Sequence, residues 1–175
     1  MNNLASIKKE ARYGMPQADQ ILYNRYYTIG YSYYFRQAKW ALEIVDPGKK
    51  DIERLDNFRA DLRVPEGFRA DKIDYEGSGY DRGHLVSSAD KNELEIQNSE
   101  TFLLSNMAPQ KPGFNRGIWK RLEEAIRNLD AKKNVWETYV VCGPIFYFDK
   151  PVEFIGAADD NGLTIPIPNA FFKSV

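Results

Sequence analysis

The chain has 175 residues, of which 43% are hydrophobic and 14% aromatic, and its formal net charge is −1. This size and apolar content fit a single globular domain over 1–175, and near-neutrality means that any attraction for polyanions must be local. The one cysteine, Cys142, excludes an internal disulfide. We expect no membrane partner, because no apolar run could span a bilayer and residues 1–4 lack the features of a secretory signal.

The first half of the chain predicts a hairpin followed by a long connection. Residues 1–27 mix charges with tyrosines and predict an N-terminal extension with one short helix. Two β-rich runs, 28–35 and 40–45, flank a polar link and predict a hairpin, which Asp46-Pro47-Gly48 ends. Residues 48–77 are polar, and so long a connection is usually functional.

The second half predicts strands around one amphipathic helix. The expected elements are strands at 81–86, 101–107 and 135–141, a helix from 118 to about 130 with apolar residues at helical spacing, and short β segments at 145–148, 163–167 and 171–172. Pro109 is expected to break the second of these strands, and Gly143-Pro144 the third. A helix packed on two strands can bring a histidine, a loop amide and helix side chains together.

The four residues Asp81-Arg82-Gly83-His84 hold the only histidine of the chain. A glycine lets the backbone approach a neighbour closely, and an imidazole titrates near neutral pH and therefore suits proton transfer. The alternative is a structural histidine beside a surface ion pair of little energetic consequence.

Residues 104–127 are locally basic although the whole chain is not. Five basic side chains stand against Glu123 and Glu124, namely Lys111, Arg116, Lys120, Arg121 and Arg127. Such clustering suits phosphate, because Arg and Lys supply charge and directed donors to phosphate oxygens. The alternative is a solvated helix face with internal Glu–Lys pairs.

Asn115 is a candidate metal ligand, since a neutral amide oxygen suits Mg²⁺ and a site with few protein ligands leaves the ion mostly hydrated. In one regular helix, Asn115 and Glu123 would lie roughly 12 Å apart along the axis, too far to bind one ion directly. Either the helix begins after Asn115, or Glu123 acts through water. The alternative role for Asn115 is a helix cap.

Three runs in the same order resemble the DNA/RNA non-specific endonucleases, the Serratia-type nucleases with a ββα-metal finger. They are residues 78–84 (Ser-Gly-Tyr-Asp-Arg-Gly-His), 100–110, and 115–119 followed by Leu122-Glu123. Weaker likeness extends over about 14–175. The resemblance implies an α+β fold, with a mixed or antiparallel central sheet flanked by helices and with the active site in the ββα finger.

The resemblance also assigns the central roles. It implies that His84 is the general base, that Asn115 is the single direct protein ligand of Mg²⁺, and that Glu123 holds a metal-bound water. Mn²⁺ is expected to substitute for Mg²⁺. The expected products carry a 5′-phosphate.

The expected partners are DNA and RNA, single- or double-stranded, held by the phosphate backbone. The residues expected to surround the scissile phosphate are Arg54, Arg82 and Arg127, with Arg116 from the basic cluster and with Asn106 shaping the site. An inhibitor or immunity protein is a further expected partner, and secretion or a periplasmic location is usual for the family.

Two departures from the family pattern stand out. Ser87 occupies a position where the family often has a proline, with little effect expected. Family members usually continue beyond a segment like Phe171-Phe172-Lys173, whereas this sequence stops at Val175, so we expect a truncated edge. The rival functions are a catalytically inactive nucleic-acid-binding module of the same fold and a phosphodiesterase for a smaller substrate.

Overall fold

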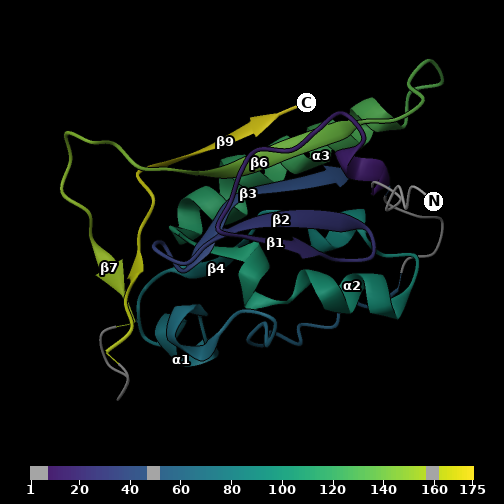
Figure 1. The fold of residues 1–175 in the computed structure, drawn as a ribbon. Coiled ribbons are helices and arrows are strands. Elements are labelled where there is room, and N and C mark those ends of the chain that lie inside the picture. The colour runs from purple at the N-terminus through teal and green to yellow at the C-terminus, as the bar shows by residue number, and fades with distance from the viewer. Residues whose placement is uncertain (1–7, 47–51, 157–161) are drawn as a thin grey trace.

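The framework of the protein is a five-stranded antiparallel sheet in the order β1-β2-β3-β6-β9 (Figure 1). The computed structural model describes residues 8–46, 52–156 and 162–175. The strands are β1 Gln20–Tyr23, β2 Tyr27–Ser32, β3 Gln37–Ile44, β6 Tyr139–Ile145 and β9 Ala170–Ser174. The predicted hairpin is confirmed as β2–β3, and the predicted α+β class is confirmed.

A second, two-stranded ribbon carries the motif residues. Its strands are β4 (Asp81–His84) and β5 (Met107–Gln110), which pair antiparallel with His84 opposite Met107. The chain then enters a wide helical turn of the π type, η5 (Phe114–Trp119), and continues as α3 (Lys120–Asp130). This strand–strand–helix unit is called the finger below.

Short helices complete the described residues. They are α1 Lys72–Tyr75, α2 Glu95–Thr101, and the 3₁₀ turns Lys9–Ala11, Glu66–Phe68, Ser88–Asp90 and Leu104–Asn106. A small ribbon, β7 (Phe154–Ile155) with β8 (Ile165–Pro166), stands away from the main sheet (Figure 1). None of the described helices is long and apolar enough to cross a membrane.

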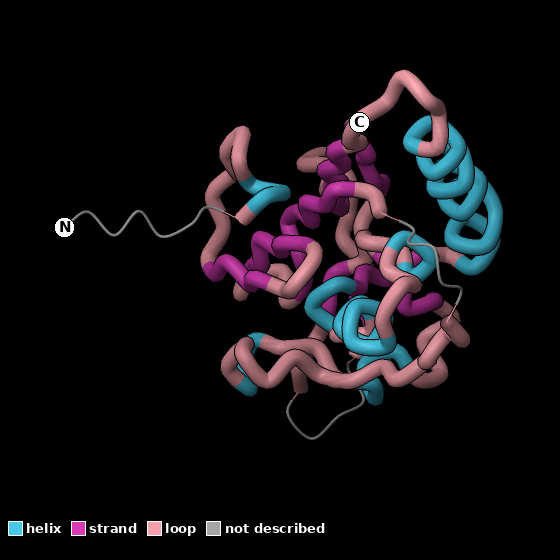
Figure 2. Tube along the Cα trace, turned by 90° about the vertical axis from the view of Figure 1, so that its right-hand side faces the viewer, coloured by secondary structure: helices cyan, strands magenta, loops and turns pink. Residues whose placement is uncertain are grey.

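The two faces of the main sheet bury different partners. One face contributes Ile29, Ala41 and Cys142 to a core that also holds Trp119 of the finger and Leu85, which directly follows β4. The opposite face packs Trp40, Leu42 and Val141 against Ala11 of the first 3₁₀ turn. Figure 2 shows α3 as the long helix lying beside the strands. The sheet therefore holds the end of β4 and the start of α3 against one rigid surface.

The second finger strand lies later in the sequence than predicted. The predicted strand at 101–107 falls mostly on the end of α2 and a 3₁₀ turn, whereas β5 begins at Met107. Pro109, expected to break the strand, lies within β5 opposite Arg82. A proline is tolerated there because β5 is an edge strand, which does not need every N–H for pairing.

The prediction that Gly143-Pro144 ends a strand at 135–141 was also wrong. β6 runs from Tyr139 to Ile145 through both residues, because Gly143 lets two strands approach closely. A Cβ at Gly143 would lie 2.3 Å from the carbonyl oxygen of Lys39. Of the predicted segment 145–148, only Ile145 is in a strand.

The predicted N-terminal extension takes part in the main sheet where it is described. Residues 8–27 contain a 3₁₀ turn and β1, and Leu22 of β1 is buried in the core. The predicted turn at Asp46-Pro47-Gly48 lies mostly outside the described residues. Residues 52–71 are largely irregular, as expected for the long connection.

Candidate active site

The finger, the loop that follows β4 and the long connection surround a cleft of about 830 Å³. This cleft brings together seven of the eight residues predicted for the site, namely Arg54, Arg82, His84, Asn115, Arg116, Glu123 and Arg127. They come from three distant parts of the chain, so the fold, and not sequence proximity, assembles the site.

His84 is the last residue of β4 and is held from several sides. Its ring meets the rings of Phe58 and Phe102 edge-on, with centroids 5.7 and 5.0 Å away. Its backbone carbonyl accepts a hydrogen bond from Trp119 Nε1 at 3.0 Å. Burial, helped by the nearby charge of Arg54, lowers the pKa of His84 to about 3. The imidazole is therefore neutral at neutral pH and able to accept a proton.

The Nε2 atom of His84 has no hydrogen-bond partner among the described protein atoms. A buried polar atom without a partner carries a free-energy cost, which is unusual for a purely structural histidine, and the His84 side chain lines the cleft. The geometry thus favours the functional role of His84 over the purely structural one.

Asn115 lies in η5 and is oriented by Asp81. Its Nδ2 donates to Asp81 Oδ2 at 2.9 Å, and Arg116 donates to both carboxylate oxygens of the same residue. Although partial burial works against ionisation, the hydrogen bonds from Arg116 and Asn115 lower the pKa of Asp81. Since the two ends of an amide point in opposite directions, the bond to Asp81 turns the Asn115 carbonyl oxygen away from that carboxylate.

Glu123 lies in the first turn of α3, where its side chain is 11% exposed. Burial raises the pKa of Glu123 to about 7, and the attraction of Lys173 opposes that rise. Lys173 Nζ lies 3.9 Å from Glu123 Oε1. This carboxylate therefore lies at the cleft wall with one buried cation behind it.

The helical start settles two alternatives for Asn115. Helical turns begin before Asn115, at residues 112–113, and Gly113 already has helical backbone angles, so the helix does not start after Asn115 and Asn115 is not its cap. Asn115 and Glu123 therefore belong to one continuous helical run, and the remaining alternative has Glu123 acting through water.

The described residues contain no group of three or more His, Cys, Asp or Glu side chains that could enclose a metal ion. An amide oxygen and a carboxylate on the wall of the same cleft fit a different kind of site, in which a hard divalent ion keeps most of its water. The donor set therefore fits a sparsely ligated, hydrated Mg²⁺-like ion.

The four arginines on the cleft wall are held by neighbours. The guanidinium of Arg82 lies 4.4 Å from the Phe58 ring centroid. Arg54 Nε donates to Asp56 Oδ1 at 2.8 Å, and Arg54 Nη1 donates to Ser88 Oγ at 3.3 Å. Fixed guanidinium groups suit a phosphate better than mobile ones, because less freedom is lost on binding.

Arg127 completes the set from the second half of α3. Its Nη1 donates to Asp90 Oδ1 at 2.8 Å, and its side chain is 20% exposed. Within the basic cluster only Arg116, Lys120 and Arg127 line the cleft, whereas Lys111 and Arg121 do not. The cluster is thus divided between a part on the cleft wall and a part outside the cleft.

Asn106 lies behind the cleft and is fully buried. Its Nδ2 donates to the carbonyls of Val86 and Thr101, and its Oδ1 accepts from the Val86 N–H. Its own carbonyl accepts from the Leu85 N–H. Asn106 can therefore influence the site through the backbone that follows His84, and its side chain does not line the cleft.

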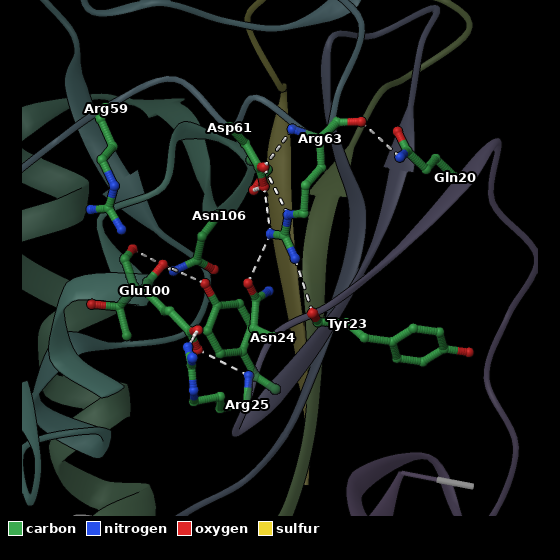
Figure 3. A network of polar contacts seen from close by, with 12 residues as sticks. Gln20, Tyr23, Asn24, Arg25, Arg59, Asp61, Arg63, Glu100 and Asn106 are labelled. Atoms are coloured by element: carbon green, nitrogen blue, oxygen red, sulfur yellow. Dashed lines mark hydrogen bonds and ion pairs between the residues drawn. The ribbon is translucent and has the colours of Figure 1, made fainter. Parts of the chain in front are cut away.

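A polar network holds the segment that carries Ser105 and Asn106 (Figure 3). Ser105, next to Asn106, donates to Asp61 at 2.6 Å, and Asp61 accepts from Arg63. Figure 3 shows that Arg63 also contacts Asn24: its Nη2 donates to Asn24 Oδ1 at 2.8 Å. The turn between β1 and β2 is thereby tied to the segment that carries Asn106.

Sequence reasoning missed two supporting residues. Asp81 orients Asn115, although its motif position suggested only an ion pair. Lys173 stands behind Glu123, but a lysine near the end of a β-like segment carries no sequence signal. Both roles depend on contacts between segments more than 30 residues apart in the chain.

Comparison with known proteins shows the family to which the chain belongs. The sequence model of the DNA/RNA non-specific endonuclease family matches residues 8–175. A nuclease of Syncephalastrum racemosum is 37% identical over 165 residues, which cover 84% of this chain and 50% of the relative. Mitochondrial endonuclease G of Homo sapiens is 37% identical over 140 residues, covering 78% of this chain and 46% of the relative.

A solved structure extends the likeness to the fold. A chain in the crystal structure of the EndoG/EndoGI complex is 30% identical, with a TM-score of 0.83 over 99% of this chain and 74% of that chain. The present chain spans about half the length of the curated relatives that it matches. The chain belongs to the DNA/RNA non-specific endonucleases, a family of metal-dependent nucleases.

Proposed function

We propose that this protein is a sugar-non-specific endonuclease that hydrolyses phosphodiester bonds of DNA and RNA and leaves 5′-phosphate ends. The main support for this proposal is that His84, Asn115 and Glu123 line one cleft together with four arginines. Family membership supports the same reaction class.

The proposed cofactor is Mg²⁺, with Mn²⁺ able to replace it. Asn115 would hold the ion directly through its carbonyl oxygen, and Glu123 would hold it through water. When bound, such an ion neutralises charge that develops on a phosphate oxygen and on the leaving oxygen. Asp81 supports this assignment because its bond to Asn115 Nδ2 selects the orientation that presents Oδ1.

His84 is the proposed general base. It removes a proton from a water molecule placed in line with the phosphorus. The water oxygen bonds to phosphorus, the bond from phosphorus to the 3′-oxygen breaks, and the 3′-oxygen leaves as a hydroxyl after taking a proton from solvent. The position of His84 on the cleft wall supports this role; the lowered pKa keeps the ring unprotonated at neutral pH and also makes it a weaker base than a free imidazole. Phe58 and Phe102 restrict the ring plane, so the accepting lone pair keeps one direction.

The cleft arginines are proposed to hold the phosphate backbone. The four arginines, Arg54, Arg82, Arg116 and Arg127, would neutralise the scissile phosphate and its neighbours. Their attraction would strengthen as negative charge develops on the phosphate in the transition state. Contacts to phosphates carry little sequence information, so cleavage should tolerate many sequences.

Digestion of plasmid DNA and of RNA tests the proposal. With Mg²⁺ both substrates should be cut, and EDTA should abolish cutting. His84→Ala should lose at least about a hundredfold in turnover, the usual scale for a general base, while still binding nucleic acid. Binding without cleavage by the unaltered protein would instead indicate an inactive binding module. If the protein cleaves small phosphodiesters and bulk DNA does not inhibit that cleavage, the protein is instead a phosphodiesterase for a smaller substrate.

We also propose that an inhibitor protein can bind this chain. The similar crystal structure is that of EndoG with EndoGI, described in terms of EndoG inhibition. Addition of EndoGI to the plasmid assay should slow cleavage, and an unchanged rate at saturating EndoGI would remove this partner.

A further inference from the structure

Lys173 is a buried lysine on the last strand of the sheet. It lies in β9 opposite Cys142 of β6, and its side chain is 2% exposed. Its Nζ lies 3.9 Å from Glu123 Oε1 and 4.4 Å from the centroid of the Trp119 ring. Lysines are almost never fully buried unless they are paired, so the burial of Lys173 beside Glu123 needs an explanation.

The lysine belongs to a layer of buried charges between the sheet and α3. Three acids and three bases form it as the pairs Glu43–Lys91 at 3.0 Å, Asp90–Arg127 at 2.8 Å and Glu123–Lys173 at 3.9 Å. The third pair is the most widely separated, and its acid is the one that the proposed mechanism requires at the metal. A looser ion pair orients a carboxylate while leaving its oxygens able to accept hydrogen bonds from water.

Trp119 links this lysine to the other half of the site. Its ring face lies against Lys173, and its Nε1 donates to the His84 carbonyl at 3.0 Å. Trp119 is 3% exposed and lies at the junction of η5 and α3. One buried ring thus fixes the lysine relative to both the proposed base and the helix that carries Glu123.

We propose that Lys173 is a positioning residue that holds the Glu123 carboxylate in the orientation needed for metal binding. The inference rests on the proposed function, since it assumes that Glu123 supports the ion through water. It makes β9, at the edge of the sheet beside β6 (Figure 1), part of the active-site architecture. Loss of the lysine charge would leave three buried acids against two bases, and Glu123 would lose its fixed partner.

A double-mutant cycle tests the inference through metal affinity. Mn²⁺ binding, followed by the electron paramagnetic resonance signal of the free ion, is measured for the unaltered protein, Lys173→Met, Glu123→Gln and the double variant. Lys173→Met should weaken Mn²⁺ binding by about tenfold or more, the scale seen when outer-shell partners of metal sites are removed. In the Glu123→Gln background the same change should alter affinity by no more than about twofold, because its target is gone.

Lys91→Met is the matched control. It also removes a buried cation from the same layer, but its partner is Glu43. Its effect on Mn²⁺ affinity should be the same in the presence and absence of Glu123→Gln. Circular dichroism identifies the folded variants, and Lys173→Gln, which keeps a polar head, takes the place of Lys173→Met in the cycle if the latter does not fold.

Independent effects of Lys173→Met and Glu123→Gln on Mn²⁺ affinity would overturn the inference, as would unchanged affinity in Lys173→Met alone. Plasmid cleavage by the unaltered protein is scored separately. Its absence would refute the proposed function, whereas coupling in the binding cycle concerns Lys173 alone, so the two failures are distinguishable.

Discussion

At the scale of single residues, the acid–base behaviour of His84 follows from its surroundings. Burial and the charge of Arg54 lower its pKa from 6.5 to about 3. A folded-state pKa below the unfolded value means that the unfolded chain binds the proton first. The stabilising contribution of the neutral ring is therefore complete above pH 6.5 and is lost as the pH falls toward 3.

His84→Gln should make the protein less sensitive to acid. Between pH 6.5 and 3 the free energy of unfolding of the unaltered protein should fall more steeply than that of the variant, by up to about 1.4 kcal/mol per pH unit for one proton. Urea denaturation at several pH values measures both slopes. Parallel slopes would show that His84 titrates normally in the folded protein.

A second prediction at this scale concerns Asp81, which orients the amide of Asn115. Asp81→Ala should weaken Mn²⁺ or Mg²⁺ binding by about 10–100-fold, because the amide is then free to rotate. Isothermal titration calorimetry measures the affinity. Asp130→Asn, at the end of α3, is the control and should bind metal normally; equal affinities in the two variants would contradict the orienting role.

At the scale of elements, the finger depends on close packing within its ribbon. Gly83 in β4 faces the buried side chain of Gln110 in β5, and a Cβ at position 83 would lie 2.2 Å from Gln110 Cδ. The glycine of the four-residue motif is thus required for packing, whereas the sequence had suggested only a close approach of some neighbour.

Gly83→Ala should destabilise the protein by about 1–3 kcal/mol, the usual cost of overpacking a filled site. Gly117→Ala is the matched control, since a Cβ at position 117 meets nothing within 4 Å. Its effect should be neutral or stabilising by up to about 1 kcal/mol, because alanine is favoured over glycine in a helical turn. Chemical denaturation compares the two, and a Gly83→Ala protein as stable as the control would show that Gln110 moves aside freely.

The sequence predicted elements well where local patterns decide them. The β2–β3 hairpin and the amphipathic α3 followed from alternation and from helical spacing. β5 and β6 did not, because Pro109 and Gly143 usually end strands and are accepted here for reasons of edge position and strand approach. Motif residues predicted the cleft lining, whereas Lys173 and the buried position of Asn106 depend on tertiary packing.

At the scale of the whole molecule, a nearly neutral protein concentrates positive charge in one cleft. The net charge is −1, yet the cavity is lined by four arginines and Lys120 against three acids, Glu76, Asp81 and Glu123. Substrate attraction should therefore come from this local cluster, and it should be screened by salt through counterion release.

Cleavage should fall steeply with salt, and Arg54→Gln should reduce the slope of log kcat/KM against log salt concentration by about one, as expected for one phosphate contact. The exposed Lys72→Gln, outside the cleft, should leave the slope unchanged. Initial rates on plasmid DNA over a series of KCl concentrations measure both. Equal slopes for the two variants would remove Arg54 from the phosphate-binding set.

The most direct test of the account is anomalous diffraction from crystals of the His84→Ala protein with Mn²⁺ and an uncleaved oligonucleotide. We predict one Mn²⁺ peak at the Asn115 carbonyl oxygen, with a backbone phosphate between the ion and position 84. A Mn²⁺ ion bound elsewhere, or a phosphate outside this cleft, would contradict the claim that His84 and an Asn115-held ion act on the same bond.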